Sequence, residues 1–325
     1  MLKYSDIIYG EISIKEPVLI EIINTPIFQR LKKISQDGAV HFIQPARCGN
    51  RFEHSIGVWY LSYRFKRGIE EQIACLLHDL SHTAFSHVID FVVGDKKQEY
   101  ADSRLNEIIL NSEIPQIVKK YGYSIEKVLD KSKFPLLDCD LPDISFDRID
   151  YFLRDGYSLG FLPKETVNLF LENIFEENHV LYFRDINIAG LYATMYLALS
   201  RLIWSDPTSH GSFFLLSRAI KGALNAGEIQ ESDFFTDYEI LLEKLKASKS
   251  NLVNNYLNRL RPGLEFEYAD KDVAEFWGPS KPRFVDPLVK TNGRLKRVSS
   301  QLVSLKYAFK EFSEKYSSLG VVQKI

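Results

Sequence analysis

Cysteine is scarce in this sequence, and neither sign of charge is in excess. Only Cys48, Cys75 and Cys139 occur in 325 residues. They are too few and too scattered for a disulfide framework or a zinc ribbon, which favours a reducing compartment. The formal net charge of −2 provides no general basic field, so charge does not indicate a nucleic-acid partner. A site for a polyanion must therefore be a local cluster of cations.

Long apolar runs are missing as well. The first twelve residues place acidic side chains among short apolar runs, unlike a secretory signal peptide. No run approaches the roughly 18 residues of a membrane span. Hydrophobic residues make up 45% and aromatic residues 13% of the chain, as is typical of a globular protein. We expect a soluble cytoplasmic protein without a membrane partner.

Histidine, in contrast, is concentrated in one stretch. Four of the seven histidines lie between Asn50 and His87. His78 and Asp79 are adjacent and close an apolar run, so this pair must be hydrogen-bonded, ion-paired or bound to a metal if it is buried. Imidazole and carboxylate together suit a divalent transition metal. His54 could supply a third ligand, and a later aspartate a fourth.

Helical patterns dominate the rest of the chain, and the predicted class is mostly α. Short β-hairpins are expected around Gly10 and between residues 173 and 185. The stretch 262–294, which contains proline and glycine, is assigned no element. Helices are predicted at about residues 18–23, 26–35, 54–67, 69–79, 84–93, 99–111, 113–121, 124–131, 147–155, from 164, 187–204, 208–226, 235–246, 249–260 and 296–315.

Three ordered segments resemble the HD-domain metal-dependent phosphohydrolases, and most closely their deoxynucleoside triphosphate triphosphohydrolase branch. They are T-P-I-F-Q-R-L at 25–31, R-F-E-H-S-I-G at 51–57 with H-D-L-S-H-T-A-F-S-H at 78–87, and F-D-R-I-D-Y-F-L-R-D at 146–155. The resemblance implies an HD-domain helical bundle over residues 1–225, and residues 226–325 are expected to form a helical extension packed on it. It also implies one divalent metal, Mn, Fe, Zn, Ni or Mg, whose ligands are His54, His78, Asp79 and Asp147.

The resemblance further implies which residues act on the substrate. His82 and His87, with Asp90 as the acidic partner, form the predicted catalytic set. An imidazole with a pKa near about 6.5 can be cationic beside a phosphate or give a proton to a leaving oxygen. The predicted substrate-binding residues are Arg51 and Arg148 for phosphates, Tyr151 for stacking, Asp155 for the sugar 3′-hydroxyl and Gln36 near the sugar.

Spacing alone supports less than this. On a helix, His82 would share a face with His78 and Asp79. Residues 147, 151 and 155 would likewise share a face. Each of these residues also has an ordinary structural explanation. Arg51, Arg148 and Asp155 could form structural ion pairs, the histidines could be hydrogen-bonded core residues, and His87 could simply start a helix.

Four positions depart from the pattern of the resembling family. Gln98, before Glu99, stands where the family has a further active-site histidine, and Tyr196 where it has an arginine for the terminal phosphates. Trp204-Ser205-Asp206-Pro207 replaces an aromatic-x-His-Pro motif. Asn24 replaces a guanine-recognising aspartate of regulated members, and an amide cannot replace a carboxylate there. These differences argue against nucleotide-activated tetramerisation and against triphosphate specificity, and they leave a simpler homo-oligomer open.

Three hypotheses for function follow. The first is hydrolysis of a deoxynucleoside triphosphate to the nucleoside and tripolyphosphate. In this hypothesis, the metal activates a water molecule that attacks the α-phosphorus. Arg51 and Arg148 hold the phosphates, and His82 assists the departing 5′-oxygen. The second is a phosphodiesterase or nucleotidase acting on a mono-, di- or cyclic nucleotide, motivated by Tyr196 and Gln98. The third is a non-catalytic nucleotide- or nucleic-acid-sensing module with a structural metal.

Overall fold

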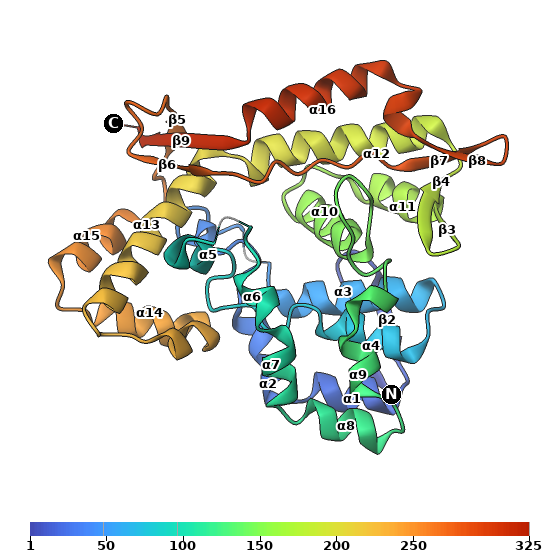
Figure 1. The fold of residues 1–325 in the computed structure, drawn as a ribbon, viewed down its shortest axis with the longest axis horizontal. Helices are drawn as coiled ribbons and strands as arrows, with labels where there is room; N and C mark the ends of the chain where they lie inside the picture. Colours follow the sequence, from blue (N-terminus) through green and yellow to red (C-terminus); the bar gives the residue numbers. More distant parts are fainter. Residues whose placement is uncertain (48, 96, 325) are drawn as a thin grey trace.

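The computed structural model describes residues 1–47, 49–95 and 97–324, and its helices confirm the mostly α class (Figure 1). Cys48 lies outside the described residues, while Cys75 and Cys139 are free thiols. The predicted hairpin around Gly10 is confirmed as antiparallel β1 and β2. The elements up to residue 93 are β1 (Leu2–Asp6), β2 (Gly10–Ile14), α1 (Pro17–Ile23), α2 (Pro26–Gln29), α3 (Arg51–Arg64), α4 (Ile69–Leu77) and α5 (Val88–Val93).

Short and long helices and a second hairpin make up residues 100–225. The hairpin predicted between residues 173 and 185 is confirmed as antiparallel β3 and β4. The elements here are α6 (Tyr100–Ser103), α7 (Leu105–Leu110), α8 (Ile114–Lys120), α9 (Ile125–Leu129), α10 (Phe146–Ser158), α11 (Lys164–Asn173), β3 (Ile174–Glu177), β4 (Val180–Phe183), α12 (Ile186–Leu199) and α13 (Pro207–Asn225). Side chains of α3, α4, α10 and α12 share one large hydrophobic core, so these helices form a fixed frame.

Two side-chain caps decide where the site-bearing helices begin. The Asn50 side chain accepts the Glu53 N–H at 3.0 Å and starts α3, which places His54 one turn into the helix. The Ser145 hydroxyl accepts the Arg148 N–H at 3.2 Å and starts α10. Such caps satisfy N–H groups that lack helical partners. The first turns of α3 and α10 therefore carry the proposed ligands His54 and Asp147.

The stretch that carries the histidines is not helical throughout, and the predicted helices 69–79 and 84–93 are both too long. Helix α4 ends at Leu77, turns occupy residues 78–87, and α5 begins only at Val88. The Arg30 guanidinium donates to the carbonyls of Leu80 and His82, each at 2.9 Å. These carbonyls thus obtain hydrogen bonds without a continuing helix, because buried backbone groups need a partner of some kind. The predicted shared helical face of His78 and His82 is therefore wrong.

Helix α12 and the π-helical turn after it form the most apolar helical segment. Ile186–Trp204 is long and apolar enough to cross a membrane by length and composition, contrary to the expectation that no run approaches this length. However, the Tyr192 ring of α12 packs against Phe152 and Phe170, with centroids 4.9 and 5.0 Å apart. We therefore interpret α12 as an internal helix of the body.

The region after residue 225 contains strands that were not predicted. Stretch 262–294 forms β5, β6 and β7, and the helix predicted at 296–315 is replaced at its start by β8 and a 3₁₀ turn. These strands are three to six residues long, which gives little alternation to detect. The elements are α14 (Tyr238–Lys246), α15 (Asn251–Arg259), β5 (Phe266–Tyr268), β6 (Phe276–Pro279), β7 (Leu288–Thr291), β8 (Arg294–Arg297), α16 (Val303–Lys315) and β9 (Ser318–Gln323).

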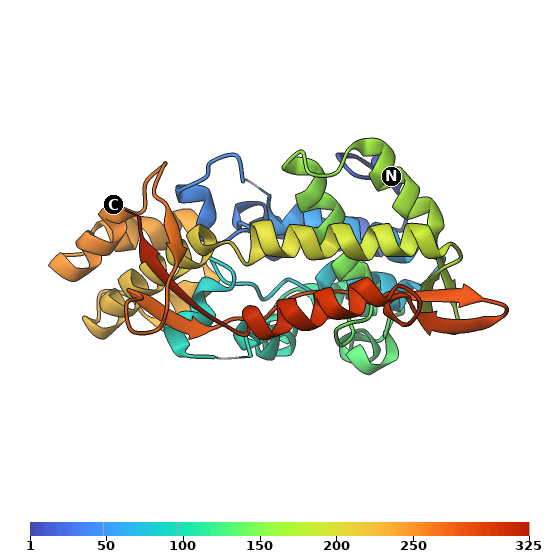
Figure 2. The same ribbon diagram turned by 90° about the horizontal axis from the view of Figure 1, so that it is seen from above.

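The C-terminal strands connect the region after residue 225 to sheets at both ends of the molecule. β7 pairs in parallel with β4 in the sheet β3-β4-β7-β8, while β6 belongs to the separate sheet β5-β9-β6. In both ribbon views the chain between β6 and β7 runs along the body, and α16 lies beside α12 (Figures 1 and 2). Residues 280–287 therefore connect two distant sheets. The boundary at residue 225 stays a prediction.

Candidate active site

The four predicted metal ligands come together at the junction of α3, α10 and the turn after α4. His54 Nε2 lies 3.2 Å from His78 Nε2 and 2.9 Å from Asp147 Oδ1. The Asp79 carboxylate lies 3.6 Å from His54 Nε2 and 3.4 Å from His78 Nε2. Apart from Asp147, these side chains are buried. Two imidazoles and two carboxylates in contact form a donor set that fits a divalent metal ion.

The outer nitrogens of both imidazoles are already engaged. His54 Nδ1 is hydrogen-bonded to Asp150 Oδ2 at 2.8 Å, and His78 Nδ1 donates to the Cys75 carbonyl at 2.8 Å. Metal-binding histidines characteristically donate their second N–H in this way, because the hydrogen bond sets the tautomer and the ring orientation. Both Nε2 atoms are consequently directed at the shared centre. Asp150 was not predicted, although its place in F-D-R-I-D-Y was available as a signal.

Asp150 is itself fixed by a buried network. Arg154 donates to its two carboxylate oxygens, each at 2.9 Å, and the Tyr9 hydroxyl donates at 2.8 Å. Arg154 also pairs with Asp6 at 3.1 Å. A Cβ at Gly57 would overlap Asp150 Oδ1, so only glycine leaves room for this carboxylate. Glycine inside a helix is otherwise unfavourable relative to alanine.

Opposite charges compensate one another inside this centre. Burial acts to lower the pKa of His54, but hydrogen bonds to Asp147 and Asp150 raise it to about 10. Burial acts to raise the pKa of Asp79, but the Arg51 cation, 2.6 Å away, holds it well below its usual range. The carboxylates are thus ionised and balanced by protonated histidine. A metal ion bound here would displace such protons.

Two of the three predicted catalytic residues, His82 and His87, line a cavity beside Asp79. His82 Nε2 lies 3.4 Å from Asp79 Oδ1, and its ring meets the His87 ring edge-on at 5.1 Å. Burial and the Arg51 cation lower the pKa of His82 to about 4. Asp90 accepts a hydrogen bond at 2.9 Å from His87 Nδ1, but it is not among the cavity-lining residues. Asp90 is therefore placed to orient His87 from behind.

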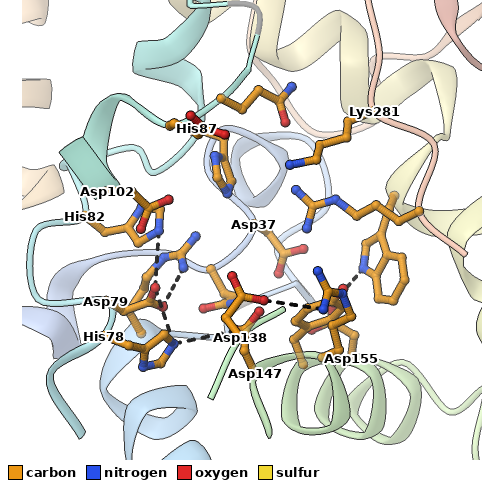
Figure 3. Close-up of a pocket in the computed structure, with 18 of the residues that line it drawn as sticks. Asp37, His78, Asp79, His82, His87, Asp102, Asp138, Asp147, Asp155 and Lys281 are labelled. Carbon is orange, nitrogen blue, oxygen red and sulfur yellow. Dashed lines mark hydrogen bonds and ion pairs between the residues drawn. The ribbon is translucent and has the colours of Figure 1, made fainter. Parts of the chain in front are cut away.

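A cavity of about 910 Å³ opens in front of the centre and is lined by all five predicted substrate-binding residues (Figure 3). Arg51 donates to Ser86 as well as to Asp79, and Arg148 lies 3.4 Å from the Asp138 carboxylate. Tyr151 shares a hydrogen bond with the Tyr196 hydroxyl. Asp155 accepts the Trp204 indole N–H at 2.8 Å, and Gln36 Oε1 is buried without a partner.

Several lining residues were missed by sequence analysis. Asp37 and Arg47 form a buried ion pair, and Arg47 also donates to Ser209 at 3.1 Å. Asp138 is a further addition beside Arg148. No motif distinguishes these positions, because each joins the site only through tertiary packing. The remaining additions to the lining include His210 from α13 and Lys281 and Arg283 from the segment after β6.

The positions that depart from the resembling family differ in their placement. Gln98 lines the cavity, whereas Tyr196 is fully buried behind Tyr151. The side-chain amide of Asn24 donates to the Ile20 carbonyl at 2.8 Å, at the end of α1. Trp204, in the π-helical turn, directs its indole at Asp155. Trp204 thus keeps the aromatic of the family motif in the cavity lining, whereas Asp206, at the histidine position, caps α13 by accepting the Ser209 N–H at 2.9 Å.

Comparisons with known proteins decide the family. The HD domain family matches residues 51–154. The uncharacterised protein YdhJ of Bacillus subtilis (strain 168) is 36% identical over 289 residues, which cover 89% of this chain and 88% of YdhJ. The metal-dependent phosphohydrolase cns2 of Cordyceps militaris is 32% identical over 233 residues, 70% of this chain and 67% of cns2. The chain belongs to the HD-domain metal-dependent phosphohydrolases.

More distant similarities extend the comparison. The deoxynucleoside triphosphate triphosphohydrolase SAMHD1 of Mus musculus is 32% identical over 211 residues, covering 49% of this HD-domain phosphohydrolase but only 32% of SAMHD1. The crystal structure of a phosphohydrolase from Bacteroides thetaiotaomicron VPI-5482 superposes with a TM-score of 0.75 over the whole of both chains at 18% identity. The structural likeness therefore shows a shared fold across the full length, C-terminal region included.

Removal of one central imidazole tests the metal centre of this HD-domain phosphohydrolase. His78→Ala should lower bound metal at least about tenfold and abolish phosphohydrolase turnover, because it removes a ligand and leaves three donors. Metal content is measured by elemental analysis of the purified protein. His179→Ala, at an exposed hairpin histidine, is the matched control and should retain metal. Full metal content in His78→Ala would show that the centre is assigned wrongly.

Substitution of Gly57 tests the support behind His54. In Gly57→Ala, the new methyl group displaces the Asp150 carboxylate, so metal affinity should fall about 10–100-fold and stability by about 1–3 kcal/mol. Metal affinity is measured by competition with a chelator, and stability by denaturant unfolding. Gly68→Ala, where a Cβ meets open space, should change metal affinity little. Unchanged affinity in Gly57→Ala would mean that Asp150 does not orient His54.

The pH dependence of stability tests the state of Asp155. Burial, aided by the Asp37 carboxylate, raises the pKa of Asp155 to about 7. Between pH 4 and 7 the unfolded chain ionises Asp155 while the folded protein keeps it protonated, so its contribution to stability falls as pH rises. The wild-type free energy of unfolding, relative to Asp155→Asn, should therefore decrease by on the order of 1–4 kcal/mol from pH 4 to 8. A constant difference in denaturant titrations would contradict this.

Proposed function

We propose that this phosphohydrolase acts on a deoxynucleoside triphosphate and releases the deoxynucleoside and tripolyphosphate. The observation that carries the proposal is that one cavity joins the metal ligands to two chemically different regions. Cations and imidazoles surround the first region, and an aspartate with aromatic side chains lines the second. A volume of about 910 Å³ suits a ligand of nucleotide size.

The region near Asp79 suits the phosphates. Arg51 and Arg148 offer planar guanidinium groups, which match phosphate oxygens in pairs. His82 and His87 face the same space (Figure 3). His82 is neutral in the protein alone, but a bound phosphate would raise its pKa because a nearby negative charge favours the imidazolium form. His82 is then placed to protonate the departing 5′-oxygen.

The opposite region suits the sugar and base. The Asp155 carboxyl is held by the Trp204 indole and can accept a hydrogen bond from a sugar hydroxyl on its other oxygen. The unpartnered Gln36 Oε1 offers a second acceptor for such a hydroxyl. The rings of Tyr151 and Trp204, 5.1 Å apart, provide apolar surface for stacking. This arrangement supports a nucleotide rather than a simple phosphate ester as substrate.

A divalent metal held by His54, His78, Asp79 and Asp147 would supply Lewis-acid activation of a phosphoryl oxygen and of the attacking water. The protein's own contribution is to orient the phosphates with Arg51 and Arg148. Deoxynucleoside triphosphate hydrolysis is the activity named for the SAMHD1 relatives, of which this chain spans about a third. That relationship supports the proposed substrate class.

A nucleotidase or phosphodiesterase acting on a shorter nucleotide is the second candidate. It is favoured by Tyr196, which occupies the position of an arginine for the terminal phosphates and is instead bonded to Tyr151. A substrate with fewer phosphates needs less positive charge. Identification of the products separates the two candidates.

A nucleotide panel tests the proposed function. Purified protein is incubated with deoxynucleoside tri-, di- and monophosphates and cyclic nucleotides in Mn²⁺, Mg²⁺, Zn²⁺ or Fe²⁺, and products are identified by mass spectrometry. We expect tripolyphosphate and deoxynucleoside from triphosphates, and no turnover by His78→Ala. Inorganic phosphate as the sole phosphorus product would refute triphosphohydrolysis. Binding without turnover of any nucleotide would instead indicate a sensing module.

A further inference from the structure

We propose that Arg283 and Lys281, in the segment between β6 and β7, form a second phosphate-binding subsite facing the metal ligands. This subsite supplies from the C-terminal region the cation that α12 lacks at Tyr196. The inference deepens the proposed function, since it concerns how the same cavity holds a polyphosphate. Both side chains line the cavity together with His78, Asp79 and Asp147, and Figure 3 shows Lys281 reaching over the cavity from the side opposite His78.

The segment that carries these cations is anchored on both sides. Before them, the Ser280 N–H donates to the Ser317 carbonyl at 3.1 Å. After them, the Phe284 ring stacks on Phe309, with centroids 4.7 Å apart and planes 20° apart. The Asp286 N–H donates to the Pro142 carbonyl at 2.9 Å. Arg283 is thus held in a defined position rather than on a freely moving loop, as a binding residue requires.

Asp286 adds a further anchor on the C-terminal side. Its carboxylate accepts the Ser299 N–H at 2.9 Å and the Ser299 hydroxyl at 2.6 Å, and Val285 beside it is fully buried. Pro142 and Asp143 belong to the loop that leads into α10, and Arg297 bonds both Asp143 and the Asp286 carbonyl. The segment therefore keeps a fixed position relative to Asp147 and Arg148 on α10.

The two cations have no acidic partner of their own. Within the described ranges, neither Arg283 nor Lys281 forms an ion pair, whereas Arg47, Arg51 and Arg148 each do. Arg283 is half-buried and interacts with the Tyr151 hydroxyl, but no carboxylate of the described residues lies within ion-pair distance of it, so it keeps guanidinium donors for a ligand. A guanidinium can grip two phosphate oxygens at once, and a lysine adds a mobile point charge.

Arg283 neighbours the tyrosine pair of Tyr151 and Tyr196, the second of which belongs to α12. The two tyrosine hydroxyls are bonded to each other, so the position that would carry an arginine offers no charge. Burial raises the pKa of both hydroxyls, and the neighbouring Arg283 cation opposes that rise. Arg283 and Tyr151 both line the cavity, whereas Tyr196 is fully buried and does not. Arg283 thus brings a positive charge from another part of the chain to the region of the cavity where Tyr196 provides none.

The other charged residues of the cavity lining explain why the cations of Lys281 and Arg283 are needed. The carboxylates of Asp37, Asp79, Asp138 and Asp147 all border the cavity, and they would repel a polyphosphate. Arg47 and Arg51 are already engaged by two of these carboxylates. A substrate with several negative charges requires further cations that are not already paired. Among the lining residues in the described part of the chain, Lys281 and Arg283 meet this requirement together.

Binding of inorganic tripolyphosphate to the metal-loaded protein tests the subsite. Titration calorimetry compares wild type, Arg283→Gln and Lys281→Gln, with Mg²⁺ in constant excess so that chelation is equal for each protein. Arg283→Gln should weaken binding about 10–100-fold, and Lys281→Gln about 2–10-fold, as expected for charge-assisted hydrogen bonds. Arg294→Gln, at an exposed arginine of β8, is the matched control and should bind as wild type. Metal content should be unchanged in all variants.

Each outcome bears on the proposal. Wild-type affinity in Arg283→Gln, or no binding by wild type, overturns it. If Arg283→Gln does not fold, the charge reversal Lys281→Glu at an exposed position decides, because unchanged affinity there removes the subsite. Nucleotide turnover by wild type with Arg283→Gln unaffected would reject the subsite and retain the proposed function. Binding through Arg283 without turnover of any nucleotide would retain the subsite and reject that function.

Discussion

The hydrogen bond between the buried Asp150 carboxylate and His54 is the interaction on which the rest of the centre depends. It joins α10 to α3, fixes the ring of His54 and directs Nε2 at Asp147 and His78. Burying this carboxylate would be very costly if it were unpaired, and Arg154 and Tyr9 offset that cost. The hairpin β1-β2 participates through Asp6 and Tyr9, so an element with no ligand of its own still supports the metal centre.

A second constraint shapes the histidine-rich turn. A continuous helix through residues 69–93 would have satisfied its backbone internally, but it would have turned His87 away from the face shared by His78 and His82. The Arg30 guanidinium instead supplies donors to the turn carbonyls. Asp79, His82 and His87 are thereby presented to one cavity. The motif T-P-I-F-Q-R-L thus has a structural consequence, because its arginine stabilises the non-helical turn.

The sequence was most informative where chemistry is concentrated and least informative where packing decides. His54, His78, Asp79 and Asp147 could be predicted to meet, because histidine and aspartate in ordered motifs resemble a known family. The end of α4 at Leu77 could not, since Leu80 and Ala84 continue an apolar pattern, and the turn carbonyls are bonded to Arg30, which is distant in sequence. Arg283 lies 136 positions after Asp147 in the numbering, in a stretch without periodicity. Its place in the cavity follows from contacts with distant segments, among them the Asp286–Pro142 hydrogen bond and the pairing of β7 with β4, which local sequence does not reveal.

Residues outside the segment matched by the HD family also contribute to the cavity. The HD family match ends at residue 154, yet the cavity wall also includes residues from α13 and from the segment after β6. The matched region brings four metal ligands but also most of the carboxylates, and many of its cations are engaged in neutralising them. The proposed polyphosphate substrate would therefore meet a region whose charges are largely balanced, and net attraction would come from the metal and from Lys281 and Arg283. Under this proposal, residues that select the substrate of this protein would lie partly outside the segment that the family match covers.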